Sequence, residues 1–388
     1  MFDTEEIKRK AIEFKLTPAD VERDYIQSWI IKEVSSDPRL SPQLTLKGSG
    51  ALRKLYYPDT RFARDLDFSA YSHVEKEFLK ERLNNIGHSI EKQTGIPFVD
   101  EVRVEDKNLP EKMQVDALEA RMYFKAIHSD GKFNLKTQVD VTRGENLSLP
   151  PQYRSIIHPY SDHELFSDTK VRSQKLEEII ATKFITLLHR RKAGDFFDLV
   201  YSIFLSPNEE INRSQIIRVL LSKTDFSRSF EHMRDYFCNF PAYETYAQSW
   251  GGLIVPLQSS MTFETAHNSF AESVPTFFDE IAAYVTRMGG RMIRPSTFSN
   301  IFREMIISGG RNKKLIKLTY TGMERDVEPY KLEFYTPQND GITKEYFWGY
   351  DRSGGTSNTQ SIKQFICDKI ENVQKTQKEY STQWEVEL

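Results

Sequence analysis

Two aspartates separated by a single leucine, Asp65 and Asp67, are the residues whose spacing most directly suggests chemistry. Residues two apart on a strand point to the same face, so a strand here holds both carboxylates side by side. Such a pair repels unless a cation lies between the two groups, and hard oxygen ligands suit Mg²⁺. We predict the third carboxylate of such a site at Asp140 in "KTQVDVTRGE", with Glu145 as a weaker fourth candidate.

A glycine-rich turn, Gly48-Ser49-Gly50, precedes the aspartate pair, and Asp65 follows Gly50 by 15 residues. A glycine turn that opens a helix lets backbone N–H groups approach phosphate oxygens. The turn alone is a weak signal, and the alternative for any single aspartate is a solvated strand end. Taken together and in this order, the residues predict a triphosphate cradle that faces a metal site.

The segment "ATKFITLLHRRKAGDFFDL" carries the basic groups that such a cradle needs. Lys183 and Arg190 are seven residues apart, which places them two turns apart on one face of a helix. A lysine point charge beneath an arginine fork suits a triphosphate. We expect Asp195 and Asp198 to orient the basic residues, with Arg191 in reach of both. The alternative is a surface helix with ordinary intrahelical ion pairs.

The elements that position these residues follow from the periodicity of the chain. Thr17 is a predicted N-cap, with Pro18 at the first helical position and Asp20 completing a capping box. A short strand at "LTL", a helix at "GALRKLY" and a strand at "DLDFSAYS" follow. An amphipathic helix then ends near Gly95, and a turn around Ser129-Asp130-Gly131 joins the last two strands. The later strands are "FVDEVRVED", "ARMYFKAIHS" and "FNLKTQVDVTRGE".

This order of elements predicts an α+β fold with a mixed sheet. We expect one helix from Lys175 to roughly Leu205, a mostly helical stretch afterwards, and a β-rich tail from about Gly309-Gly310. A chain of 388 residues exceeds what one core usually holds. We therefore predict three domains, at residues 1–205, 206–307 and 308–388.

Composition excludes several classes of protein. The formal net charge of −3 gives the chain no overall positive charge that would attract nucleic acid, so any nucleic-acid site must be a local basic patch. Two cysteines, Cys238 and Cys367, exclude a disulfide framework and a zinc site built from several cysteines. The charged first residues do not resemble a signal peptide, and no apolar run approaches the length of a membrane span. We expect a cytoplasmic protein with no membrane partner.

These motifs resemble the AbiEii/MenT nucleotidyltransferase toxins of type IV toxin–antitoxin and phage-defence systems, within the polymerase-β-like superfamily. The family pattern is a helix like "VERDYIQSWII", then "KGGTAL", "RFSEDLDF", a later strand aspartate, and a helix like "AEKL..LL.R.K.RDLYDL". Here the last four stand as "KGSGALRKLY", "RFARDLDFS", "QVDV" and "ATKFITLLHRRKAGDFFDL". The resemblance covers roughly residues 15–205 and extends more weakly to about 300.

Two departures from the family pattern concern the phosphate site. Ser49 and Gly50 replace the second glycine and the threonine of "KGGT", but Gly-Ser is the usual pair in the wider superfamily. Gly194 stands where the family has the arginine of "RD..DL". Either Arg191 compensates for it, or one phosphate or RNA contact is missing. This departure puts the choice of substrate in doubt more than the fold or the metal chemistry.

The resemblance implies transfer of a nucleotide from an NTP to an acceptor, with release of pyrophosphate. It implies Mg²⁺ or Mn²⁺ bound by Asp65, Asp67 and Asp140, the last as a third ligand or as the base for the acceptor hydroxyl. Some family members modify the 3′ end of tRNA, so the expected partners are NTP, tRNA and a cognate antitoxin of the transcription-regulator type. The residues that the resemblance assigns to the nucleotide are Lys47, Gly48, Ser49, Lys183, Arg190, Arg191, Asp195 and Asp198.

The tail resembles a WYL domain, a small Sm-like β-barrel of bacterial regulators, over about residues 308–380. The family run of "Y…R.VEP..L", "WYL..YD" and "R.F.LDRI..V" stands here as Tyr320, "RDVEP", "YFWGYD" and "IKQFICDKIENV". WYL domains are associated with sensing nucleic acid or small ligands. The binding candidates are therefore Tyr320, Arg325, Trp348, Lys363 and Lys369, although Tyr320 and Trp348 suit a plain aromatic core nearly as well.

Two functions therefore remain open from the sequence. The first is a Mg²⁺-dependent nucleotidyltransferase toxin whose C-terminal domain senses or positions nucleic acid. The second is a regulator that binds NTP and nucleic acid without turnover. Labelling of tRNA by wild-type protein, lost on substitution of the aspartates, discriminates between them.

Overall fold

A computed structural model describes residues 4–107, 116–145, 147–190, 192–205, 211–223, 226–239, 243–287, 298–335, 344–355 and 359–388. The chain divides into two compact units. The first comprises Met1–Glu145, Pro151–Leu220 and Thr224–Asp279, and the second comprises Asn146–Pro150, Leu221–Lys223 and Glu280–Leu388. No helix among the described residues has both the length and the apolar character needed to cross a membrane.

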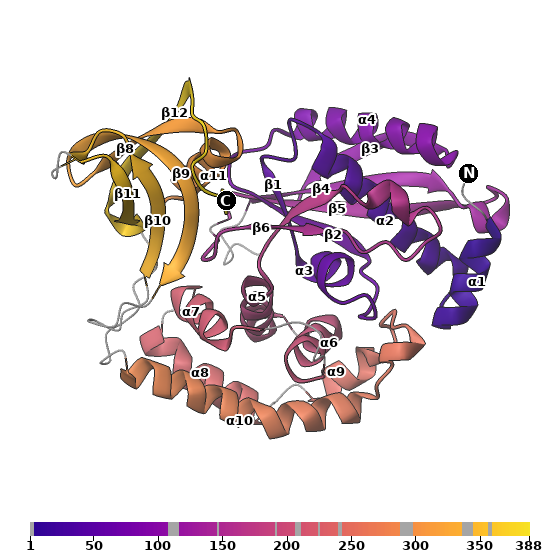
Figure 1. The fold of residues 1–388 in the computed structure, drawn as a ribbon. Helices are drawn as coiled ribbons and strands as arrows, with labels where there is room; N and C mark the ends of the chain where they lie inside the picture. The colour runs from indigo at the N-terminus through magenta and orange to yellow at the C-terminus, as the bar shows by residue number, and fades with distance from the viewer. Residues whose placement is uncertain are drawn as a thin grey trace. The chain divides into compact units, whose positions relative to one another are not determined.

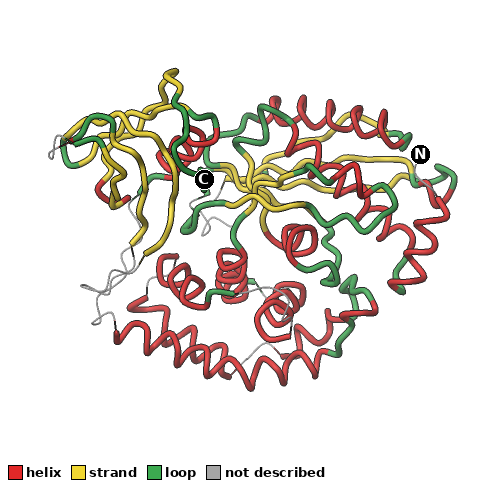
Figure 2. Tube along the Cα trace, viewed as in Figure 1, coloured by secondary structure: helices red, strands yellow, loops and turns green. Residues whose placement is uncertain are grey.

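The first unit is built on a seven-stranded mixed sheet with the order β3-β4-β5-β2-β1-β7-β6 (Figures 1 and 2). Strands β2 and β5 run parallel, as do β1 and β7, and the other neighbours are antiparallel. The fold is thus mixed α+β, as the order of elements predicted. The strands are β1 Leu44–Lys47, β2 Asp65–Ala70, β3 Phe98–Asp106, β4 Asp116–Lys125, β5 Asn134–Arg143, β6 Gln152–Ser155 and β7 Lys170–Ser173.

Helices α2 and α4 contact each other and the sheet, α2 against β5 and β7 and α4 against β3 and β4. Thr17 caps α2 as predicted, since its hydroxyl accepts from the N–H of Asp20 at 3.2 Å. Gly95 ends α4 in the left-handed conformation that favours glycine. The helices before the second sheet are α1 Thr4–Phe14, α2 Pro18–Ser36, α3 Gly48–Ala51, α4 Lys76–Thr94, α5 Leu176–His189, α6 Ala193–Val200, α7 Arg213–Lys223, α8 Phe226–Asn239, α9 Tyr243–Trp250 and α10 Phe263–Arg287.

The continuous helix expected from Lys175 to Leu205 is wrong. Helix α5 ends at His189, Arg190 has an extended backbone, and α6 begins at Ala193. A π-helical turn, Tyr201–Leu205, continues α6. Helices α5 and α6 pack against each other, and Figure 1 shows them on the same side of the sheet as α3 in that view. The break changes how the basic residues of this segment meet.

The second unit contains a five-stranded antiparallel sheet with the order β11-β10-β9-β8-β12. Helix α11, Asn300–Arg311, packs on this sheet, and Ile306, Ile316 and Phe347 lie in its buried core. The closed Sm-like barrel expected from the resemblance stays a prediction. The strands are β8 Lys314–Tyr320, β9 Met323–Tyr335, β10 Lys344–Asp351, β11 Ser361–Ile366 and β12 Ile370–Glu379.

Gly309 and Gly310 lie inside α11, where they permit close packing. A Cβ at Gly309 would lie 2.7 Å from Ile316 Cγ2, and one at Gly310 would collide with Leu388 Cδ1. These glycines therefore let the helix approach the sheet. The division into three domains at residues 205 and 307 stays a prediction.

Candidate active site

The predicted carboxylates meet in one row across the sheet of the first unit. Asp67 on β2 is paired in register with Asp140 on β5, and Lys47 on β1 lies opposite Asp67 on the other side. Glu119 on β4 continues the row beyond Asp140. Paired residues of neighbouring strands face the same side, so the row is continuous. Asp65 shares this face with Asp67, as the spacing predicted.

The glycine turn brings the backbone against the second aspartate. Gly48 has a φ of +66°, and a Cβ at this position would lie 2.7 Å from Asp67 Oδ2. A side chain here would be strained and would also collide with the carboxylate. Gly50 is similarly close to the strand, because its Cβ would lie 3.1 Å from Leu66 Cδ2. The turn can thus lie directly against the aspartate-bearing strand.

Burial and like charge act together on the carboxylates. Burial raises the pKa of Asp67, and the neighbouring Asp65 carboxylate raises it further, while Lys47, Lys183 and Lys107 act in the opposite direction. Burial also raises the pKa of Asp140, which is only 4% exposed. An added cation at this face would favour the ionised form of both groups.

Lysines already neutralise part of this negative charge. Lys107 Nζ contacts Asp140 Oδ2, and Gln138 Nε2 donates to the other oxygen of Asp140 at 3.0 Å. Lys47 Nζ contacts Glu145 and donates to Thr142 Oγ1 at 3.0 Å. With these partners in place, no group of three His, Cys, Asp or Glu side chains in the described part of the chain is arranged to hold a metal ion.

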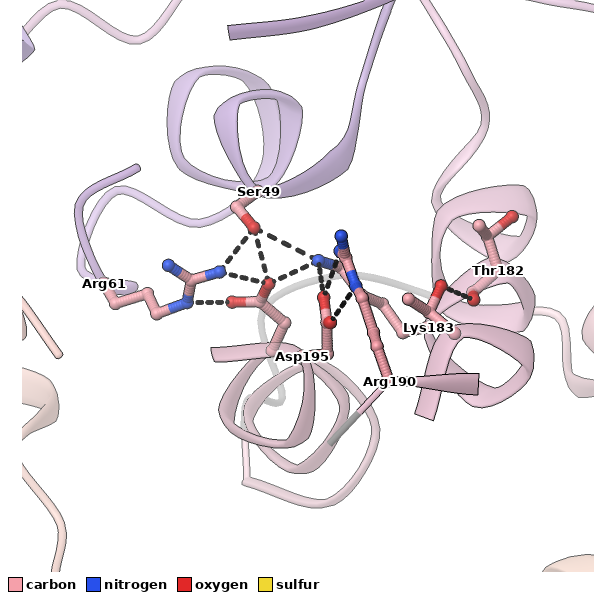
Figure 3. Close-up of polar contacts among 8 residues, drawn as sticks. Ser49, Arg61, Thr182, Lys183, Arg190 and Asp195 are labelled. Atoms are coloured by element: carbon pink, nitrogen blue, oxygen red, sulfur yellow. Dashed lines mark hydrogen bonds and ion pairs between the residues drawn. The ribbon is translucent and has the colours of Figure 1, made fainter. Parts of the chain in front are cut away.

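Five charged side chains and a serine form a second cluster beside the turn (Figure 3). Lys183 Nζ lies 2.9 Å from Asp195 Oδ1 and 2.7 Å from Asp198 Oδ2. Arg190 Nε donates to Asp195 at 2.8 Å, and Arg61 Nε donates to Asp198 at 2.7 Å. The Ser49 hydroxyl donates to Asp198 at 2.7 Å. We call these six residues the basic cluster: Ser49, Arg61, Lys183, Arg190, Asp195 and Asp198.

The basic cluster has one more cation than it has carboxylates. Burial acts to raise the pKa of Asp195, but Lys183 and Arg190 outweigh it and hold the pKa below its usual range. Burial likewise opposes ionisation of Asp198, and Arg61 with Lys183 again leaves its pKa lowered. Both carboxylates are therefore ionised at neutral pH. Burial acts to lower the pKa of Arg190, but Asp195, Asp67 and Asp65 outweigh it, so the aspartates of β2 also act on this cluster.

The predicted ladder of Lys183 and Arg190 on one helix face is wrong in its geometry, because α5 ends before Arg190. The two cations meet instead through Asp195, which accepts from both. Asp195 and Asp198 orient the basic residues, as expected, but across the break between two helices. Arg191 lies outside the described residues.

Two residues that contact the site were absent from the sequence prediction. Arg61 stands in "RFARDLDF", four residues before Asp65. Its place in this motif could have marked it as a site residue. Lys107 follows β3, and its N–H donates to the carbonyl of Ala117 at 2.7 Å, so the strand pairing carries it to Asp140. No local pattern marked Lys107, because it depends on long-range pairing of strands.

The structure groups three of the five candidates in the second unit. Arg325 Nη1 donates to Asp351 at 2.7 Å, and Lys363 Nζ donates to the same oxygen at 3.1 Å. The Arg325 guanidinium also lies 5.9 Å from the ring centroid of Tyr320. Trp348 follows the buried Phe347 on β10 and so points to the opposite face of the sheet, and Lys369 is exposed after β11.

The comparison with protein families decides which family this chain belongs to. A family model described as "Nucleotidyl transferase AbiEii toxin, Type IV TA system" matches residues 29–250, more than half of the chain. This chain belongs to the AbiEii nucleotidyl transferase toxin family. The matched region contains the glycine turn, the three aspartates and the basic cluster. The chain is therefore a nucleotidyltransferase, whereas the sheet from β8 to β12 lies beyond the AbiEii match.

Two solved structures resemble this AbiEii chain at low identity. JHP933 from Helicobacter pylori has 17% identity and a TM-score of 0.44, covering 71% of this chain and 98% of its own. MenT4, a nucleotidyltransferase toxin from Mycobacterium tuberculosis, has 14% identity and a TM-score of 0.47, covering 72% and 90% respectively. No curated protein sequence matches the chain.

Proposed function

We propose that this AbiEii-family chain transfers a nucleotide from an NTP to the 3′ end of tRNA with the help of Mg²⁺ or Mn²⁺. The observation that carries the proposal is the register of the sheet, which places Asp67 beside Asp140 and leaves Asp65 on the same face. The glycine turn and the basic cluster lie next to this carboxylate face. One site thus combines oxygen ligands for a metal with cations for a triphosphate.

The donor set fits a hard divalent cation. Mg²⁺ is typically bound by one or two carboxylates together with substrate phosphates, and Asp65 with Asp67 supplies that pair. Asp140 is either the third ligand or the base for the acceptor hydroxyl, and its two oxygens already accept from Lys107 and Gln138. A bound Mg²⁺ supplies stabilisation of the charge that develops on the transferred phosphate.

The basic cluster supports binding of the triphosphate. The Arg190 side chain is 46% exposed, and its bonds to Asp195 use its Nε and Nη2 groups. A guanidinium can bind phosphate oxygens in a bidentate manner. Lys183 is 8% exposed and supplies buried positive charge behind Arg190. The backbone of Gly48 and Ser49 completes the proposed cradle, with Lys47 at its edge.

The transfer itself needs an acceptor hydroxyl that loses its proton. The acceptor oxygen forms a bond to the α-phosphorus, the bond from that phosphorus to the bridging oxygen breaks, and pyrophosphate leaves. If Asp140 is the base rather than the third ligand, it takes this proton, and burial, which raises its pKa, favours that role. Lys107, which contacts Asp140, can hold the carboxylate in place before the acceptor arrives.

Incubation of the full chain with tRNA, each labelled NTP and Mg²⁺ tests this function. We expect label on tRNA with wild-type protein and none with Asp65→Ala or Asp67→Ala. Glu77→Ala, which removes an exposed carboxylate from the first turn of α4, is the control and should label tRNA as wild type does. Tight NTP binding with no labelled RNA from the wild-type protein would favour the regulator instead. Intact-mass measurement of co-incubated RNA and protein would reveal another acceptor.

The family points to a toxin that a cognate antitoxin restrains. We therefore expect expression of the chain to arrest bacterial growth and Asp67→Ala to relieve the arrest. Equal toxicity of the two proteins would rule out a catalytic cause. Co-expression with the product of a neighbouring gene of the transcription-regulator type tests the antitoxin directly.

The second unit is proposed to bind nucleic acid or a small anionic ligand. Arg325 and Lys363 both converge on the fully buried Asp351, so two cations share one carboxylate there. The partly buried Tyr320 ring lies beside Arg325 and packs edge-on against Phe365. Lys363→Met should weaken binding of fluorescent single-stranded RNA to the full chain, whereas Lys378→Met, at an exposed lysine of β12, should not.

A further inference from the structure

Arg61 connects the glycine turn to helix α6, because its side chain contacts both Ser49 and Asp198. Its Nε and Nη2 groups donate to the two oxygens of Asp198 at 2.7 and 2.8 Å, which makes a bidentate pair. The same Nη2 group also contacts the Ser49 hydroxyl. The Arg61 side chain is 12% exposed and Asp198 is 1% exposed, so water competes little for these bonds.

The hydroxyl of Ser49 has no hydrogen-bonding capacity left in this arrangement. A serine hydroxyl offers one donor and two acceptor lone pairs. Ser49 Oγ donates to Asp198 at 2.7 Å and accepts from Arg61 and from Lys183, the latter at 3.1 Å. A phosphate could reach this hydroxyl only by breaking one of the three bonds. The side chain of Ser49 therefore anchors the turn, and the phosphates are left to the backbone and Arg190.

Gly194 supplies the space that Arg61 occupies. A Cβ at position 194 would lie 3.0 Å from both Cζ and Nη2 of Arg61 and 3.4 Å from its Nε. Contacts of 3.0 Å are tighter than side chains normally make, so an alanine here would require the guanidinium to shift by a few tenths of an ångström. In this chain Gly194 thus leaves room for Arg61 in its present position against Asp198.

We propose that Arg61 is a positioning residue of the nucleotide site. By holding Asp198 and the Ser49 hydroxyl together, it fixes the turn at Gly48–Gly50 in the geometry that the triphosphate requires. Gly194 is the residue that gives the guanidinium room. This role rests on the proposed triphosphate site, because it concerns how that site is held rather than what it binds.

Nucleotide affinity of the full chain, measured by calorimetry with ATP, CTP, GTP and UTP in turn, tests the role. For the nucleotide that wild type binds tightest, Arg61→Lys and Ser49→Ala should each raise the Kd by about 10- to 100-fold, as loss of supporting partners does at other sites. Arg64→Lys is the matched control, because Arg64 is an exposed arginine that donates only to the carbonyl of Gly252 among its described bonds. Its Kd should stay within about twofold of wild type.

A double-mutant cycle separates positioning from independent effects. Gly194→Ala alone should raise the Kd, because its methyl group displaces the Arg61 guanidinium. In the Arg61→Lys background the same change should have less than about half that effect in log units, because no guanidinium carbon occupies the space. Additive effects of the two changes would overturn the match between Gly194 and Arg61.

Loss of folding must be kept apart from loss of positioning. Arg61→Lys leaves a buried carboxylate with a poorer partner, so a second variant pairs Arg61→Gln with Asp198→Asn and removes both charges together. This double variant should unfold near the wild-type temperature while its Kd remains raised. Recovery of wild-type affinity in it would show that Arg61 matters only for charge balance, and would refute the positioning role.

The outcomes also distinguish failure of the positioning role of Arg61 from failure of the proposed nucleotide site. If wild type binds none of the four nucleotides, the phosphate site is refuted and the role of Arg61 falls with it. If wild type binds a nucleotide and both Arg61→Lys and Ser49→Ala bind it equally well, only the positioning role is refuted.

Discussion

Replacement of Lys183 by methionine tests how the basic cluster is held together. Methionine keeps an unbranched side chain of similar length in α5 but removes the ammonium group and its three hydrogen bonds. These bonds run to Ser49 at 3.1 Å, to Asp195 at 2.9 Å and to Asp198 at 2.7 Å. The net formal charge of the basic cluster falls from +1 to zero.

The expected cost follows from the ion pairs that remain. At an effective dielectric constant of 20, each pair of Lys183 with a carboxylate is worth about 6 kcal/mol of Coulomb energy, most of which desolvation cancels. Breaking a buried pair costs about 3–5 kcal/mol when the partner is left alone. Here Arg190 still neutralises Asp195 and Arg61 still neutralises Asp198. We therefore expect a loss of about 2–3 kcal/mol.

Hydrogen exchange of peptides that cover α5 and α6, followed over a urea series, measures the free energy of unfolding where the change lies. Lys192→Met is the control, because Lys192 is exposed and precedes α6; it should change the free energy by less than about 0.5 kcal/mol. Nucleotide affinity should also fall in Lys183→Met, because the charge behind Arg190 is gone.

The difference in the free energy of unfolding between wild type and Lys183→Met should depend on pH. Asp195 and Asp198 have lowered pKa values in the folded chain, so their contribution to stability is present above the unfolded value, about 3.9, and is lost as pH falls through the folded values. The difference should be full at pH 7 and should shrink below about pH 4. Equal stability of the two proteins at pH 7, or a difference that grows on acidification, would refute the arrangement described.

Three further substitutions probe other parts of the first unit. Asp67→Asn should raise the melting temperature in the absence of metal, because burial and Asp65 disfavour the ionised carboxylate; a lower melting temperature would contradict this. Gly48→Ala should lower the free energy of unfolding by about 1–3 kcal/mol and abolish nucleotide transfer, because φ is +66° and the methyl group would collide with Asp67. Circular dichroism on heating measures the loss of stability, and the tRNA-labelling assay measures the loss of transfer. Glu22→Gln should speed hydrogen exchange around His128, because the buried Glu22 carboxylate accepts from its backbone and ring; unchanged exchange would exclude that anchor.

The local signals in the sequence predicted elements well where one residue type dictates the backbone. Thr17 marked the start of α2, and Gly95 marked the end of α4. Asp130 and Gly131, both with positive φ, form the turn between β4 and β5 where Ser129-Asp130-Gly131 was expected. Such positions can be predicted from the sequence because the preference for one residue type depends only on the backbone conformation at that position.

The carboxylate face was also predictable, because alternation along a strand is a property of the backbone. Asp65 and Asp67 share a face for that reason alone. The partnership of Asp67 with Asp140 needed more, since it depends on which strands are neighbours and in what register. Asp140 was predicted as the third carboxylate, but neither periodicity nor the resemblance gave the register that pairs it with Asp67.

The basic cluster shows where periodicity fails. Spacing of seven residues predicted that Lys183 and Arg190 share a helix face, but the helix ends between them. Helical periodicity does not reveal a break of a few residues when the segments on both sides of it are helical. Arg61 and Lys107 were missed for a related reason, because their partners lie 137 and 33 residues away.

The pairing of β2 with β5 also limits how this part of the chain can change in length. Since side chains alternate, insertion of one residue into either strand would turn every following side chain to the opposite face. An insertion ahead of Leu66 in β2 would bring Leu66 to the site in place of Asp67, and one ahead of Val139 in β5 would bring Val139 there in place of Asp140. Length variation among relatives should therefore fall between the strands, and an alignment that places a gap inside β2 or β5 should be read as misaligned.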